Sequence, residues 1–178
     1  KYFEVPIDNN SDCLNNIDFI VSYGYRYIIN EDIIDRFKKR IVNLHISYLP
    51  WNRGAHPNFW SFLDDTPKGV SMHLINEGAD PGDWLVQKAV SYCTDDTLKV
   101  SYNRLSDSIE LLFLKFWPDI RLEKIKPIAQ IGKGSTHKKQ DLEKYKYLLH
   151  KGWDTPVLDI LNRQDIWFIG VIGLLWYL

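Results

Sequence analysis

Cysteine is nearly absent from this chain. Cys13 and Cys93 are the two cysteines among 178 residues, too few for a disulfide scaffold or a cysteine-built metal site. Such scarcity fits a reducing cytoplasm. Histidine supplies no metal motif either, because His45, His56 and His73 lack the spacing of zinc ligands. We therefore expect a cytoplasmic protein that holds no metal.

An excess of charge is also missing. The chain has 22 Lys and Arg against 23 Asp and Glu, a formal net charge of −1. Nucleic-acid-binding domains usually carry a basic excess, so we expect no nucleic-acid partner. Residues 1–16 contain no apolar stretch that would suit a signal peptide. Since 45% of the chain is hydrophobic, it can build a substantial core.

Long runs that are both uncharged and apolar throughout are rare, and the exception is segment 166–178. It is short for a membrane span, which needs about 20 apolar residues, so we expect no membrane insertion. A buried strand or docking segment is the interpretation we favour. A tail altered by a frameshift, or a contact with a membrane or partner, are the alternatives.

Strands and helices alternate along the first half of the chain, which predicts an α/β fold. The apolar run 17–23 reads as a buried strand, residues 31–39 as a helix opened by acidic residues, and 41–44 as a second strand. Strand, helix and strand within about 30 residues are typical of a parallel sheet. Further elements are expected at 58–65 (helix), 69–75 and 84–92 (strands) and 95–117 (a long amphipathic helix limited by Pro118).

Asn43 and His45 are the first candidates for chemistry. Residues two apart in a strand face the same side, and the carboxyl ends of strands in open α/β sheets border ligand sites. A histidine can move protons near neutral pH, and an asparagine amide can donate to an oxyanion. Taken alone, the pair favours the simpler interpretation of a packed, hydrogen-bonded histidine and a structural asparagine.

Two loops offer partners for this pair. Asp80, in the acidic loop 77–83, could orient His45 and support its charged form, or the loop could simply be a turn. Arg53, in the loop 48–54, could clamp a phosphate or carboxylate, or make a surface ion pair. The basic patch of Lys133 and residues 137–139 could attract a diphosphate, although a solvated turn is the simpler interpretation.

Three consecutive segments together resemble a known family. Val42-Asn-Leu-His-Ile-Ser-Tyr-Leu-Pro-Trp-Asn-Arg-Gly54 resembles the signature Asn-x-His-x-Ser-x-Leu-Pro-x-x-Arg-Gly of the folate-dependent formyltransferases. Segments 66–73 and 76–83 are similar to that family's Thr-Gly-Val-x-x-His and Gly-x-Asp-x-Gly-Asp elements, in the same order. Within the family, residues 51–62, 134–139 and 152–156 look most like the nucleotide-sugar N-formyltransferases.

The resemblance implies a Rossmann-like formyltransferase fold with a mostly parallel sheet. It also implies that the chain lacks the family's first strand–helix–strand unit. We expect residues 1–120 to form an N-terminally incomplete catalytic core and residues 121–178 a small C-terminal extension with an apolar tail. Because sugar N-formyltransferases are commonly dimers, a homodimer is expected.

The resemblance also implies a reaction. N10-formyltetrahydrofolate would donate a formyl group to the amine of a nucleotide-linked amino sugar, with dTDP as the expected nucleotide, for surface-polysaccharide (O-antigen) synthesis. Asn43 and protonated His45 would stabilise the oxyanion, and Asp80 would orient His45 and help to remove the amine proton. Glycinamide ribonucleotide and methionyl-tRNA remain alternative acceptors, and a non-catalytic folate- or nucleotide-binding remnant is a third interpretation.

The same resemblance assigns the binding residues. The formyl donor is expected to contact two segments, and the substrate the loop after the strand that carries His45. The residues expected to bind the folate are Tyr25, Arg26, Ile28, Ile75, Asn76 and Glu77, and those expected to bind the substrate are Tyr48, Trp51 and Arg53.

Overall fold

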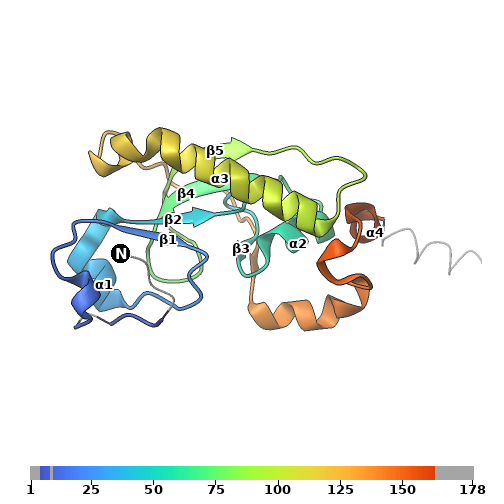
Figure 1. Ribbon diagram of the computed structural model, residues 1–178, viewed down its shortest axis with the longest axis horizontal. Coiled ribbons are helices and arrows are strands. Elements are labelled where there is room, and N and C mark those ends of the chain that lie inside the picture. The colour runs from blue at the N-terminus through green and yellow to red at the C-terminus, as the bar shows by residue number, and fades with distance from the viewer. Residues whose placement is uncertain (1–4, 9, 163–178) are drawn as a thin grey trace, which may run out of the picture.

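The computed structural model describes residues 5–8 and 10–162 (Figure 1). Four strands form one sheet, a two-stranded ribbon lies beside it, and a long helix crosses one face. The strands are β1 (Ile20–Tyr23), β2 (Ile41–His45), β3 (Arg53–Gly54), β4 (Gly69–Leu74), β5 (Trp84–Ala89) and β6 (Thr136–His137), and the α-helices are α1 (Glu31–Phe37), α2 (Pro57–Leu63), α3 (Leu98–Arg121) and α4 (Val157–Leu161).

The main sheet has the strand order β1-β2-β4-β5. β1 and β2 run parallel, as the strand–helix–strand pattern predicts. The β2–β4 and β4–β5 pairs are antiparallel, so the described strands form a mixed sheet and not the mostly parallel one expected. For β4 and β5 the reason is the short connection of residues 75–83, because a parallel crossover needs a dozen or more residues.

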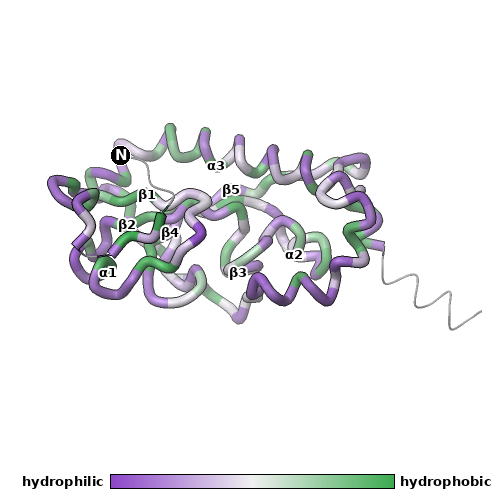
Figure 2. Tube along the Cα trace, turned by 60° about the horizontal axis from the view of Figure 1, so that its bottom comes forward, coloured by the Kyte–Doolittle hydropathy of each residue, from purple (hydrophilic) through white to green (hydrophobic). Residues whose placement is uncertain are grey.

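Alternation along β2 and β4 sorts their side chains between two faces. Val42 and Leu44 of β2 pack with Val70 and Met72 of β4 in a core covered by α3. Residues of α3 that enter this core recur every three or four positions, and hydrophobic and hydrophilic residues alternate along that helix in Figure 2. This face therefore supplies the packing that holds the sheet in place.

The opposite face carries the polar residues. Ile41 packs there against Ile33 and Phe37 of α1. Asn43 and His45 follow Ile41 at steps of two and so project on its side of the sheet. The fold thus places the two strand residues singled out by the sequence on the face that α3 does not cover.

Several expected elements differ in extent: β5 ends at Ala89 and not at residue 92, and α3 begins at Leu98 and not at residue 95. The strand predicted at 17–23 spans only Ile20–Tyr23, and its residues alternate between partly buried and exposed, because it lies at an edge of the sheet. The long helix runs through Pro118 to Arg121. Pro118 has no N–H to donate to the carbonyl of Leu114, and Leu114 lies on the exposed side of the helix, where 71% of the residue is exposed.

The described part of the C-terminal extension packs onto the core. Leu142, Val157 and Ile160 share a buried cluster with Phe59 of α2 and Leu98 of α3. The division at residues 120 and 121 stays a prediction, and the apolar tail 166–178 lies outside the described residues. Among the helices that are described, none combines the length and apolarity that a membrane crossing requires.

Replacing Ile109 tests the packing of α3 on the sheet. Ile109 is fully buried in the α3 core, so Ile109→Ala should lower the free energy of unfolding by about 2–5 kcal/mol. Leu111 on the same helix is 65% exposed, and Leu111→Ala should change it by less than about 0.5 kcal/mol. Urea denaturation of both variants measures this, and equal losses would contradict the packing described.

Candidate active site

The carboxylate of Asp80 is the meeting point of four groups. Its Oδ1 accepts a hydrogen bond from Asn43 Nδ2 at 3.1 Å and lies 3.3 Å from His73 Nε2. Its Oδ2 accepts from the Gly54 N–H at 2.8 Å and lies 3.6 Å from His45 Nε2. Only 16% of the Asp80 side chain is exposed. The structure therefore brings together the three residues predicted to be catalytic.

The short ribbon β3–β6 aims the Gly54 N–H at Asp80. The Arg53 and Ala55 N–H groups donate to carbonyls of Ser135 and His137, so the N–H between them points the other way. Gly54 has a φ of +85°, and a Cβ there would lie 2.4 Å from the His137 carbonyl oxygen. Only glycine fits this close approach.

Asp80 is held in its ionised form. Burial alone would raise its pKa, but the neighbouring His45 and His73 and the Gly54 N–H outweigh burial and hold the pKa of Asp80 well below its usual range. Asp80 itself has a φ of +52°, a strained conformation for a residue other than glycine. The surrounding contacts must therefore fix its backbone as well as its charge.

His45 is neutral at neutral pH. Burial lowers its pKa below the ordinary 6.5, and Asp80 only partly opposes this. A protonated His45 at the oxyanion stage, as the resemblance implies, would therefore have to gain its proton during the reaction. His45 Nε2 faces two acceptors, the Asn52 carbonyl at 3.2 Å and Asp80, so the neutral ring carries its proton on Nε2 and its free lone pair on Nδ1.

His73 is the residue of this cluster to which the sequence analysis gave no role. It is 1% exposed, and its Nδ1 lies 2.8 Å from the Leu74 carbonyl oxygen. With the proton on Nδ1, Nε2 accepts from Asn43 Nδ2 at 3.2 Å. Asp80 Oδ1 accepts a hydrogen bond from the same nitrogen, Asn43 Nδ2. Both N–H groups of the Asn43 amide are therefore engaged. The signal in the sequence that could have indicated a role for His73 is its place as the histidine at the end of the family-like segment 66–73. It lies two positions from Ser71, so both residues project from the same face of β4.

The two segments expected to bind the folate lie together. Tyr25 and Ile75 pack against one buried cluster, and the Ile75 N–H donates to the carbonyl of Ile41 in β2. Glu77 lies close enough to Glu31 to raise the pKa of that carboxyl by charge repulsion. The three remaining residues of the set, Arg26, Ile28 and Asn76, are exposed.

The predicted substrate residues lie on the loop beside Asp80. Tyr48, Trp51 and Arg53 are all partly buried. Arg53 Nε donates to Gln130 Oε1 at 2.8 Å, so part of its guanidinium is engaged within the protein. Gln130, in the segment after α3, carried no prediction, because nothing in the sequence indicates that it returns to this loop.

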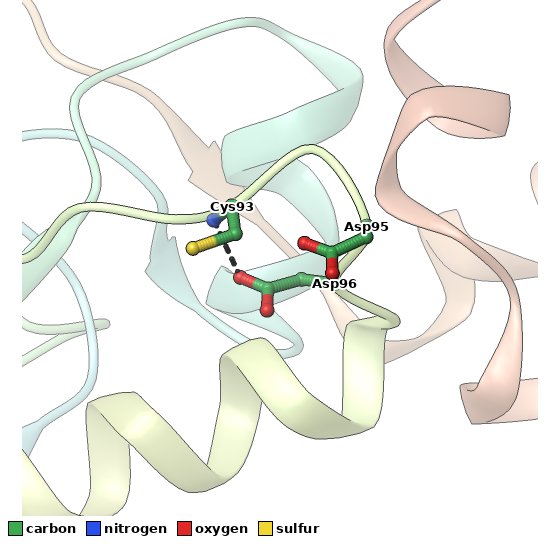
Figure 3. Close-up of side chains that lie close together, drawn as sticks. All are labelled: Cys93, Asp95 and Asp96. Carbon is green, nitrogen blue, oxygen red and sulfur yellow. Dashed lines mark hydrogen bonds between the residues drawn. The ribbon is translucent and has the colours of Figure 1, made fainter.

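A group of possible metal ligands lies away from this site. Side-chain atoms of Cys93, Asp95 and Asp96 come within 4.8 Å of one another (Figure 3). The Asp96 carboxylate, however, accepts from the Cys93 N–H at 2.7 Å and from Arg104 Nη2 at 2.8 Å. We therefore assign this group to the structure at the start of α3.

Comparison with known proteins identifies the family. The formyl transferase family model matches residues 9–115, which include the whole cluster around Asp80. The chain belongs to the formyl transferase family. Methionyl-tRNA formyltransferase of Prochlorococcus marinus subsp. pastoris is 33% identical over 165 residues, covering 89% of this chain and 49% of the relative. The chain thus spans about half the length of that curated relative.

Solved formyltransferase structures share the α/β fold. PseJ from Anoxybacillus kamchatkensis, solved with UDP-4,6-dideoxy-4-formamido-L-AltNAc and tetrahydrofolate, is 57% identical with a TM-score of 0.87, over 89% of this chain and 84% of PseJ. An N-formyltransferase from Helicobacter canadensis, solved with folinic acid and dTDP-3-aminofucose, is 27% identical with a TM-score of 0.61, over 68% and 45%. The folate formyl donor expected of the family agrees with both complexes.

Gly54→Ala tests the contact that presents the Gly54 N–H. Its Cβ would collide with the His137 carbonyl, which should displace β3 and destabilise the chain by clearly more than the roughly 1–2 kcal/mol of a positive φ alone. Gly132 has a φ of +91° and open space around it, so Gly132→Ala should cost no more than that conformational term. Chemical denaturation of both variants decides, and equal destabilisation would contradict the close approach.

Proposed function

We propose that this chain transfers a formyl group from N10-formyltetrahydrofolate to the amine of a nucleotide-linked amino sugar. The observation that carries the proposal is the set of contacts that His45, His73, Asn43 and the Gly54 N–H make with the Asp80 carboxylate. Membership of the formyl transferase family supports it. So does the 57% identity to PseJ, whose complex contains a formamido sugar nucleotide.

The nucleotide of the substrate is UDP in this proposal, not the dTDP expected from the sequence. PseJ was solved with a UDP-linked 4-formamido sugar at 57% identity, whereas the Helicobacter enzyme solved with a dTDP sugar is 27% identical. We therefore favour a UDP-linked 4-amino-4,6-dideoxy sugar as acceptor. A homodimer, a cytoplasmic location and a role in surface-polysaccharide synthesis complete the proposal.

The reaction requires one proton to leave the amine and one to reach the departing nitrogen. The sugar amine forms a bond to the formyl carbon, the carbonyl oxygen gains negative charge, and the bond from that carbon to N10 then breaks. The amine must be neutral to attack, and it becomes acidic once the new bond forms. A neutral base can accept the amine proton, and a carboxylate fixed beside that base can stabilise the positive charge that the base then carries.

His45 and Asp80 have the properties of that pair. His45 starts neutral because its burial lowers the pKa, so its Nδ1 lone pair can take the amine proton. The imidazolium produced would have its Nε2–H 3.6 Å from the Asp80 carboxylate, which stabilises the positive charge. The same proton can then pass to N10 as the bond between N10 and the formyl carbon breaks.

Asn43 supplies the oxyanion contact by exchanging a partner. Both of its N–H groups are engaged, one by His73 and one by Asp80. Asp80 keeps the Gly54 N–H when one of these bonds is given up, and His73 keeps the Leu74 carbonyl. An N–H of Asn43 can therefore turn to the developing negative charge at little cost to its neighbours.

The folate segments fit a pterin ring. Tyr25 and Ile75 contribute to one apolar cluster, which offers a surface for a flat aromatic ring. Glu31 and Glu77 at its rim are acceptors that lie near each other, and a pterin carries amino and ring N–H donors. We propose that the ring lies against this cluster with those donors toward the carboxylates.

Mass spectrometry of the acceptor tests the function. The chain is incubated with N10-formyltetrahydrofolate and either UDP-linked or dTDP-linked 4-amino-4,6-dideoxy sugars. We expect a mass gain of one formyl group with the UDP sugar. Asn43→Ala should lower kcat by roughly 10²–10³, the usual effect of losing one oxyanion donor, and His45→Ala should abolish the gain.

His150→Ala is the matched control, since His150 is an exposed histidine away from Asp80, and it should leave the rate unchanged. Faster transfer to the dTDP sugar would overturn the choice of nucleotide alone. Formylation of methionyl-tRNA or glycinamide ribonucleotide in preference to either sugar, or folate binding with no turnover, would refute the sugar N-formyltransferase.

A further inference from the structure

Gln130 makes three short hydrogen bonds to the two loops that meet at Asp80. Its Nε2 donates to the main-chain carbonyls of Asp80 at 2.8 Å and Gly82 at 2.7 Å. Its Oε1 accepts from Arg53 Nε at 2.8 Å. These bonds use both N–H groups and the carbonyl of one amide, and they connect positions 48 to 77 residues apart.

The three bonds act on both sides of one contact. The Asp80 carbonyl belongs to the residue that carries the carboxylate, and that residue has a φ of +52°. Arg53 immediately precedes Gly54, whose N–H donates to the carboxylate. Gln130 therefore ties the acceptor of the Gly54–Asp80 bond to its donor.

The segment 130–137 that begins with Gln130, here the strap, fixes the same loop further along. Gly134 approaches so closely that a Cβ would lie 2.1 Å from the Pro50 carbonyl oxygen, and the Ser135 hydroxyl accepts from the Asn52 N–H at 2.8 Å. Within the strap, Gln130 is the side chain that reaches the Asp80 loop. The strap thus provides a fixed base from which Gln130 acts.

We propose that Gln130 is a positioning residue that holds the Asp80 carboxylate in place for the reaction of His45. This inference deepens the proposed function and rests on it for its catalytic consequence. Without Gln130, the strained backbone of Asp80 relaxes and the carboxylate separates from the Gly54 N–H. The imidazolium of His45 then loses its fixed counter-charge.

Hydrogen exchange tests the positioning without any need for activity. Gln130→Met keeps the size of the side chain and removes its donors and acceptor. The Gly54 N–H should then exchange roughly tenfold faster or more in NMR, because exchange reports local opening. The Ala55 N–H, bonded to the His137 carbonyl, should keep its rate. An unchanged Gly54 rate would overturn the proposal, as would equal acceleration at Ala55, which would mean that the strap had simply detached.

Kinetics test the catalytic consequence. Gln130→Met should lower kcat by about 10–100-fold, the range seen for residues that orient a reactive group, while KM for the sugar and the melting temperature stay close to wild type. In an Asp80→Asn background the same substitution should cost nothing further, because the residue acts through Asp80. If Gln130 acted independently of Asp80, the fold-decreases in kcat of the two single variants would multiply in the double variant.

Gln140→Met is the matched control, because Gln140 is exposed, and it should behave as wild type in both experiments. If the wild-type chain formylates no acceptor, the proposed function fails, whereas the exchange rates at Gly54 and Ala55 still decide the positioning role. If the wild type is active and the two fold-decreases in kcat multiply in the double variant, the role of Gln130 is overturned and the proposed function stands.

Discussion

The carboxylate of Asp80 lies 16% exposed between two histidines, and the other groups near it depend on its charge. Ionised, it fixes the Asn43 amide with its nitrogen inward and receives the Gly54 N–H at 2.8 Å. It also provides the counter-charge for any proton that His45 takes up. Protonation of this one group would weaken the acceptor for Asn43 and the Gly54 N–H and remove the counter-charge beside His45.

Several features of the fold hold that carboxylate within contact distance of His45, Asn43 and the Gly54 N–H. α3 packs on one face of the sheet, so the polar side chains of β2 and β4 gather on the other. The ribbon β3–β6 turns the Gly54 N–H toward Asp80, at a place where only glycine fits. Gln130 then holds the two loops together. Packing, backbone geometry and side-chain bonds therefore act on a single point.

The sequence predicted the parts of this arrangement that follow local rules. Strand periodicity placed Asn43 and His45 on one face, and the acidic loop supplied Asp80 as their partner. It did not predict the antiparallel pairing that sets His73 opposite Asn43, nor the return of Gln130 over about 50 residues, because both depend on tertiary contacts. Nor did it reveal that burial lowers the pKa of His45, because residue spacing does not report burial.

The central claim is that surrounding donors keep Asp80 ionised in spite of its burial, and its own titration tests this most directly. Carbon NMR of the Asp80 carboxyl group, assigned with Asp80→Asn, follows protonation as the pH is lowered. We expect no protonation of Asp80 at the ordinary aspartate pKa of about 3.9, so that the stability from this group is present above that pH and is lost only as the pH falls toward the lowered pKa. A midpoint at or above the ordinary value would contradict it, because burial would then outweigh the donors.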